Sequence, residues 1–151
     1  MTDVVSGLVF LAVAVGMEGV AWAMHKYVMH GFLWVLHEDH HHPRGRGLQK
    51  NDLFAVFFAV ISIGLIYDGV FRQAPVVAAA GLGMALYGAG YVSFHDIMFH
   101  RRVRWLHLRP RGRYLQRIVH AHSIHHRSRG RTGAESFSFL WAPKKYDVAS
   151  G

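Results

Sequence analysis

Three long apolar runs alternate with polar, strongly basic segments along the chain. The runs cover residues 4–24, 53–71 and 76–94, and only Ser6 and Glu18 interrupt the first one. At about 1.5 Å per residue, helices of this length cross a hydrocarbon core of about 30 Å. The pattern therefore predicts an all-α integral membrane protein with about three transmembrane helices. A length of 151 residues indicates one domain, 1–151.

The second and third runs are separated only by residues 72–75, so they are expected to form a membrane hairpin. Small residues in the third run should let helices pack closely. They include Gly81, Gly83, Gly88 and Gly90. The first run follows Thr2 and Asp3 without a basic flank, which favours a retained helix over a cleaved signal peptide.

Basic residues lie almost entirely on one side of this arrangement. Of the 17 Lys and Arg residues, only Arg72 falls in the turn at the opposite side. The positive-inside tendency makes the basic side cytoplasmic and the N-terminus external. A formal charge of +8 is also typical of nucleic-acid binding. Because the basic residues adjoin membrane-length runs, we instead expect contact with membrane lipid and none with nucleic acid.

Polar residues near the first two runs suggest how these helices start and continue. Residues 25–42 are expected to extend the first helix as an amphipathic segment up to Pro43. Asn51 or Asp52 suits the N-terminal cap of the next helix. Glu18 is costly inside a membrane, and both a role in shaping a site and simple snorkelling or packing are compatible with it.

The C-terminal third of the chain is too charged to cross a membrane. Residues 101–131 carry ten arginines and predict cytoplasmic interfacial structure that is helical after Pro110 and Gly112. Residues 135–143 are apolar but too short to span. Covering of a site and simple interfacial packing are both open for this tail.

The histidines repeat one order of spacings in two parts of the chain. The first set is His25-x4-His30 followed by His37-x2-His40-His41. The second set is His95-x4-His100 followed by His122-x2-His125-His126. Ten of the 13 histidines belong to these sets, and the others are His42, His107 and His120.

Helical geometry treats the two spacings differently. His37, His40 and His41 fall within an arc of about 100° on a helix, so this triplet should aim at one point, as should the second triplet. Five residues rotate a helix by about 140°, so His25 and His30 cannot share one narrow face. Either such pairs straddle two metals or the backbone is distorted there.

Clustered imidazoles are typical of iron, zinc, copper or nickel sites rather than calcium or magnesium sites. The absence of cysteine excludes iron–sulfur clusters and thiolate zinc sites. Since one ion seldom takes more than about six ligands, ten histidines predict a dimetal site. A membrane metal transporter is the rival from another class, but transport sites usually lie near mid-membrane, and these histidines follow helix ends.

Two carboxylates adjoin the histidine sets. Asp39 and Asp96 are candidates to accept N–H hydrogen bonds from neighbouring imidazoles, which would fix the ring tautomer. Their alternative roles are solvated surface groups or helix caps.

Four segments carry a resemblance to a known family. They are His25-Lys26-Tyr27-Val28-Met29-His30-Gly31, His37-Glu38-Asp39-His40-His41, Phe94-His95-Asp96 with His100-Arg101-Arg102, and Ala121-His122-Ser123-Ile124-His125-His126. They resemble bacterial β-carotene hydroxylases, which belong to the membrane fatty-acid hydroxylase superfamily. Residues 50–54 and 136–143 also resemble that family, so the likeness covers nearly the whole chain.

The resemblance implies a non-haem diiron monooxygenase. Such an enzyme would use O2 and two electrons, typically from ferredoxin, to hydroxylate carbon 3 of carotenoid β-ionone rings. β-Carotene would become β-cryptoxanthin and then zeaxanthin, and ketolated carotenoids are further candidate substrates. By resemblance the two irons are held by His25, His30, His37, His40, His41, His95, His100, His122, His125 and His126. A related lipid or sterol hydroxylase, or a desaturase, is the alternative, because substrate choice lies in the pocket. The oligomeric state is left open.

Overall fold

The computed structural model describes residues 1–43, 45 and 47–148. Within those residues all regular structure is helical, as the sequence predicts. The elements are α1 (Thr2–Ala23), η1 (Met24–Phe32), α2 (Trp34–His41), α3 (Asp52–Phe71), α4 (Pro75–Tyr91), η2 (Val92–Phe99), α5 (Gly112–His125) and η3 (Lys144–Tyr146). Here η1 and η2 are π-helices, and η3 is a short 3₁₀-helix.

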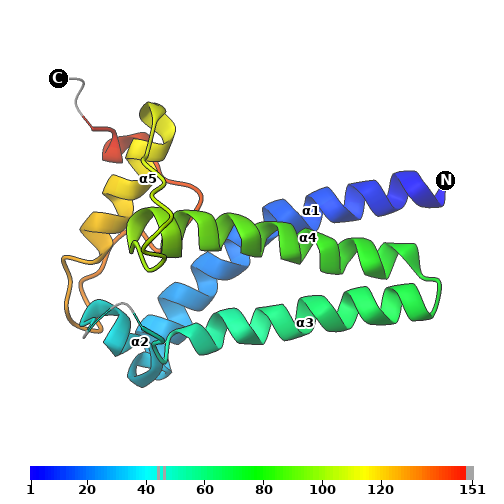
Figure 1. Ribbon diagram of the computed structural model, residues 1–151, viewed down its shortest axis with the longest axis horizontal. Helices are drawn as coiled ribbons and strands as arrows, with labels where there is room; N and C mark the ends of the chain where they lie inside the picture. The colour runs from blue at the N-terminus through cyan, green and yellow to red at the C-terminus, as the bar shows by residue number, and fades with distance from the viewer. Residues whose placement is uncertain (44, 46, 149–151) are drawn as a thin grey trace.

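Three long helices form an elongated bundle in which α4 packs against both α1 and α3 (Figure 1). The N-terminus and the α3–α4 turn lie at one end of the bundle, and α2, α5 and the C-terminal segment lie at the other. The α3–α4 hairpin is therefore confirmed. Both histidine-bearing regions lie at this second end of the bundle, because α1 and α4, which precede them in the chain, both run toward it.

The bundle presents apolar side chains outward. Leu8, Val15, Val60 and Ile63 are 63–76% exposed, which suits contact with lipid tails rather than water. Three helical stretches are long and apolar enough to cross a membrane. They are Thr2–Phe32, Asp52–Phe71 and Pro75–Phe99. The chain is an all-α membrane protein with three candidate spans.

Close helix packing depends on two of the four glycines singled out in the third run. A Cβ at Gly83 would lie 2.6 Å from the Phe10 carbonyl oxygen in α1. A Cβ at Gly81 would lie 2.8 Å from the backbone of α3, and the Ser62 hydroxyl donates to the Gly81 carbonyl at 2.8 Å. Gly88 has no neighbouring atom within 4 Å of such a Cβ, so the packing expectation is wrong there.

The first and third membrane helices both end as π-helices. The Leu33 amide donates to the Val28 carbonyl at 3.0 Å, and the His100 amide donates to the His95 carbonyl at 2.9 Å. Each bond spans five residues, the spacing that defines a π-helix. The expectation of one continuous amphipathic helix over residues 25–42 is wrong, because the backbone departs from helical geometry at Gly31 before α2 begins.

The basic end of the molecule has its own core, which joins η2, α5 and the C-terminal tail. The buried members are Phe94, Ile118, Ala121, Phe139, Ala142 and Tyr146. α5 supplies two of them from one face while its arginines stay partly or fully exposed, the arrangement expected of an interfacial helix. The tail therefore packs over η2 and α5.

Candidate metal centre

Ten histidines converge at the basic end of the bundle in two groups of five. Group 1 consists of His25, His30, His37, His41 and His125. Group 2 consists of His40, His95, His100, His122 and His126. Within each group, one ring nitrogen from every member lies within 4.8 Å of the others. His42, His107 and His120 lie outside both groups, as the sequence analysis expects.

The π-helices explain how each x4 pair reaches one group. An i→i+5 hydrogen-bonding pattern brings residues five apart onto nearly the same face. His25 and His30 therefore both point into group 1, and His95 and His100 both point into group 2. Of the two alternatives left open by the spacing, the structure has the distorted backbone rather than a pair that straddles two sites.

The triplets, however, do not each aim at one point. His37 and His41 are one helical turn apart and stay together, with their Nε2 atoms 3.2 Å apart. Between them, His40 points away and brings its Nε2 within 3.0 Å of His95 Nε2 in group 2. The second triplet mirrors this, because His125 reaches the Nε2 of His30 in group 1 at 3.2 Å. Adjacent residues diverge by about 100° on a helix, which is enough to face separate centres.

Hydrogen bonds orient all five rings of group 1. Each Nδ1–H donates to an uncharged oxygen at 2.6–3.0 Å. The acceptors are the carbonyls of Phe137, Arg131, Ser128 and Glu135 and the side-chain oxygen of Asn51. Since these oxygens can only accept, Nδ1 carries the proton and the Nε2 lone pair faces the group interior.

Group 2 is held by side chains that converge on one arginine. His40 Nδ1–H donates to Gln49 Oε1 at 2.9 Å, and His95 Nδ1–H donates to Asp96 Oδ1 at 3.0 Å. Arg102 lies 3.3 Å from Asp96 and forms two 2.6 Å hydrogen bonds with Asp52.

The hydrogen bonds around group 2 form one connected network. Asp52 Oδ2 in turn accepts the Gln49 amide at 2.9 Å, so the Asp52–Arg102 pair supports the orienting groups of two ligands. His122 Nδ1 is buried without a partner among the described residues.

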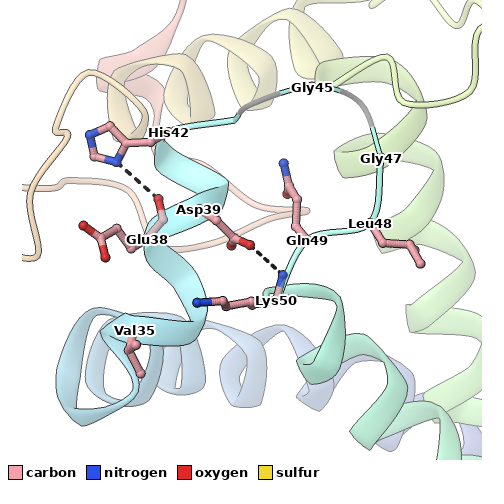
Figure 2. Close-up of a pocket in the computed structure, with 9 residues that line it drawn as sticks. All are labelled: Val35, Glu38, Asp39, His42, Gly45, Gly47, Leu48, Gln49 and Lys50. Carbon is pink, nitrogen blue, oxygen red and sulfur yellow. Dashed lines mark hydrogen bonds between the residues drawn. The ribbon is translucent and has the colours of Figure 1, made fainter.

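Asp39, the other carboxylate expected to orient a ligand, does not do so. Its Oδ2 accepts the Lys50 amide at 2.7 Å, as Figure 2 shows, and this bond ties α2 to the segment before α3. Both residues line a polar surface cleft of about 710 Å³ together with Glu38 and His42. Gln49, which lines the same cleft, has the ligand-orienting role for which Asp39 was a candidate.

Burial keeps neutral the imidazoles that α2 contributes to the two groups. Burial lowers the pKa of His40 to about 4 and that of His41 to about 4. Burial, helped by the neighbouring His40, lowers the pKa of His37 to about 2. Neutral rings with inward Nε2 lone pairs are what a transition metal requires of histidine ligands.

The spacing of the nitrogens fits metal ions. Nε2 atoms of neighbouring rings in a group lie 3.0–3.4 Å apart. Ligands at about 2.1 Å from one ion and at right angles to each other lie about 3 Å apart. The groups contain nitrogen donors alone, without carboxylate or thiolate, which suits first-row transition metals. The residues present therefore fit two such ions, with five nitrogens for each.

An apolar cavity of about 460 Å³ adjoins the histidines within the bundle. Its walls come from α1, η1, α3, α4 and the tail, and include Met17, Met29, Phe54, Tyr87, Tyr91 and Phe139. Tyr91 stacks on His95 with ring centroids 4.6 Å apart, and Phe139 stacks on His25 at 4.8 Å. These two rings lie between the cavity and both histidine groups.

Comparison with known proteins accounts for the combination of two histidine groups with an apolar cavity. The profile of the fatty acid hydroxylase family matches residues 10–143. The chain belongs to the fatty acid hydroxylase family. The β-carotene hydroxylase of Pseudescherichia vulneris is 43% identical over 145 residues, covering 95% of this chain and 81% of that protein. The β-carotene hydroxylase of Pantoea ananas is 43% identical over 138 residues, 91% of this chain and 78% of that protein.

Less similar relatives include plant proteins. The chloroplastic β-carotene 3-hydroxylase 2 of Arabidopsis thaliana is 34% identical over 146 residues, 91% of this chain and 46% of that protein. No solved structure matches the chain significantly. The family resemblance read from the histidine segments is thus confirmed.

In this hydroxylase-family chain, sequence reasoning proposed Asp96, which accepts from His95, but missed the other residues that orient the ligands. Asn51 or Asp52 was expected to cap α3. Asn51 is the N-cap residue, but its side chain makes no capping bond and accepts from His37 instead. Gln49 lies outside the segments that carry the resemblance, and Arg102 lies inside one of them, but sequence reasoning assigned neither residue a role. Four further acceptors are main-chain carbonyls, which leave no signal in residue type.

Proposed function

We propose that this membrane hydroxylase is a β-carotene 3-hydroxylase with a diiron centre. In the balanced reaction, a ring C–H bond, O2, two electrons and two protons yield C–OH and water. β-Carotene would pass through β-cryptoxanthin to zeaxanthin. The observation that carries the proposal is the meeting of two five-histidine groups with an apolar cavity, in a chain 43% identical to β-carotene hydroxylases.

Iron is proposed because hydroxylation of an unactivated carbon needs a redox-active metal, which zinc is not. When bound, two irons would supply the activation of O2. One iron would be held by the nitrogens of group 1 and the other by those of group 2. The ten histidines named from the sequence remain the proposed ligands. His40 comes from the first histidine set but would bind in group 2, and His125 comes from the second set but would bind in group 1.

The residues of the chain itself would bind and place the substrate. The cavity offers apolar walls to a β-ionone ring, and its volume of about 460 Å³ suits one end of a carotenoid whose remainder stays in lipid. Tyr91 and Phe139 would bring that ring beside both histidine groups. Burial of these groups would also limit access of bulk water.

The basic surface supports a cytoplasmic orientation in a bacterial inner membrane. It would also attract an acidic ferredoxin-type electron donor, since complementary charge accelerates encounter. Anionic lipid is expected to share that surface. One domain would thus combine substrate, metal and reductant sites.

Expression in a β-carotene-producing bacterium, followed by pigment chromatography, tests the proposal. We expect β-cryptoxanthin and zeaxanthin, together with two irons per chain by elemental analysis. His37→Ala, which removes one group 1 nitrogen, should abolish both pigments. A matched His107→Ala variant alters an exposed histidine outside both groups and should keep them.

The family profile itself is named for fatty acids, so an acyl lipid is the second candidate substrate. The same cells should therefore be analysed for hydroxylated fatty acids. Hydroxylated acyl chains without any hydroxycarotenoid would contradict the carotenoid assignment and support this alternative.

A further inference from the structure

Glu18 lies in the middle of α1, inside the first membrane span. Its Oε1 accepts three consecutive backbone amides, those of Phe139, Leu140 and Trp141, at 2.9, 2.9 and 3.0 Å. Its Oε2 accepts the hydroxyl of Tyr87 in α4 at 2.8 Å. Four donors thus satisfy an acidic side chain that is costly to place within a membrane. Snorkelling to the surface is therefore not its role.

The three amides belong to a tail segment, residues 135–142, here called the strap. The strap backbone bends around Glu18 Oε1 so that three successive N–H groups point at one atom. Such an arrangement holds the bend of the strap at one point along α1, because three successive amides can meet one oxygen only where the backbone turns around it. Close packing against α4 adds to this, since a Cβ at Gly90 would lie 3.0 Å from Leu140 Cδ1.

The strap also reaches the histidines. The carbonyls of Glu135 and Phe137 accept the Nδ1–H groups of His125 and His25 at 2.9 and 2.8 Å. The Phe139 ring lies 4.8 Å from His25 and 5.5 Å from His95, between centroids. A shift of the strap would therefore move two rings of group 1 and the aromatic wall between the cavity and both groups.

We propose that Glu18 is a positioning residue that sets the place of the strap, and thereby how closely and at which carbon a substrate ring meets the metal centre. The inference rests on the proposed hydroxylation. Phe139 lines the cavity beside the histidines, so its position limits how far a ring can advance. Tyr87 lines the same cavity and holds the other oxygen of Glu18, which ties the cavity wall to the strap.

Three substitutions separate hydrogen bonding from packing. Glu18→Leu keeps an apolar side chain suited to a membrane helix but removes every acceptor. Glu18→Gln keeps an oxygen for the three amides and offers an N–H to the Tyr87 oxygen. Glu18→Asp keeps the carboxylate but withdraws it by one methylene. Asp68→Asn is the matched control, because it neutralises an exposed carboxylate paired with Arg72 at the far end of α3.

The variants are compared as full-length, iron-loaded proteins in lipid nanodiscs. Hydrogen exchange of the strap amides is measured by mass spectrometry, and products are analysed for the position of the hydroxyl and for O2 consumed per product. Glu18→Leu should speed exchange at residues 139–141 by at least about tenfold, since the oxygen that accepts all three amides is lost.

The product pattern of each variant should change in parallel with its amide exchange rates. Glu18→Leu should increase O2 consumption without product and yield hydroxyl groups at carbons other than 3. Glu18→Gln and Asp68→Asn should retain the wild-type exchange rates and product pattern. Glu18→Asp should give intermediate values of both.

Unchanged strap exchange and unchanged products in Glu18→Leu would overturn the proposal. If that variant is not recovered folded, Glu18→Asp carries the test, and wild-type values there would overturn it equally. Loss of product in Glu18→Gln with normal strap exchange would also overturn it, because the oxygen would then matter for another reason. A wild-type protein that makes no hydroxycarotenoid, yet shows strap exchange that depends on Glu18, would defeat the proposed function while leaving the positioning contact in place.

Discussion

Replacing Arg102 with glutamine is expected to weaken metal binding in histidine group 2 and leave group 1 intact. Arg102 faces Asp52 and Asp96 with side chains that are only 14%, 24% and 20% exposed. Its hydrogen bond with Asp52 raises the pKa of the guanidinium, so the charge persists at every working pH. Loss of the arginine would leave two poorly hydrated carboxylates without their counter-charge.

The free-energy cost of removing Arg102 can be bounded from these contacts. Removing one partner of a fully buried ion pair costs about 3–5 kcal/mol, and partial exposure reduces this to about 2–3 kcal/mol here. The effect on metal should be larger than the effect on folding, since groups that orient histidine ligands contribute about 10–100-fold in metal affinity. Two ligands are affected, because Asp96 orients His95 and the Gln49 amide bonded to Asp52 supports His40.

Chelator competition on the iron-loaded protein measures this difference. The wild type should release its two irons at higher chelator concentrations, whereas Arg102→Gln should release one iron about 10–100-fold more readily. Arg102→Lys should fall between them, because an ammonium cannot reproduce the paired bonds to Asp52. Arg72→Gln is the control, since its pair with Asp68 is 73% and 48% exposed.

Two results would refute this account of Arg102. One is wild-type affinity for both irons in Arg102→Gln. The other is equal weakening of both, which would point to general destabilisation rather than to group 2.

Three further outcomes are expected. His40→Ala should lower the metal content by about one ion and perturb the spectrum of the group that contains His95. His41→Ala should instead perturb the spectrum of the group that contains His25. Iron analysis and Mössbauer spectroscopy measure these effects. Gly83→Leu should lower the thermal unfolding temperature in detergent, because overpacking costs about 1–3 kcal/mol, while Gly88→Ala, which meets no atom within 4 Å, should not. Ferredoxin-driven turnover should fall with added salt more steeply than turnover with a small uncharged reductant, and equal salt sensitivity would contradict docking on the arginine surface.

Much of the membrane architecture could be predicted because it depends on composition over long windows. The apolar runs at 53–71 and 76–94 correspond to α3 and to the start of α4 within one or two residues. The x4 histidine pairs were also informative, since a regular α-helix cannot bring His25 and His30 onto one face. That conflict between spacing and α-helical geometry left two alternatives, a pair straddling two metals or a distorted backbone, and the structure has the second.

The partition of the ligands could not be predicted in the same way. His37, His40 and His41 share an arc on an ideal helix. The sequence around His40 does not reveal that a second group of histidines lies within its reach. The partners of the rings are equally hidden, because carbonyls such as that of Phe137 are common to every residue. Glu18 was noticed as an anomaly, but Tyr87 lies 69 residues away in the chain, and the three amides that it accepts lie more than 100 residues away.

The exchange of His40 and His125 has a consequence for how the centre assembles. Neither part of the chain can complete a group of five alone, because α2 supplies one ring to group 2 and α5 supplies one ring to group 1. Metal ions bound in the two groups would therefore cross-link α2 to α5 twice, in opposite directions. Since these helices reach the bundle through a kink at Gly31 and an irregular segment after η2, the cross-links would add stability where no continuous helix joins α2 and α5 to the bundle. Metal binding and closure of the cavity's histidine end would then be one cooperative event.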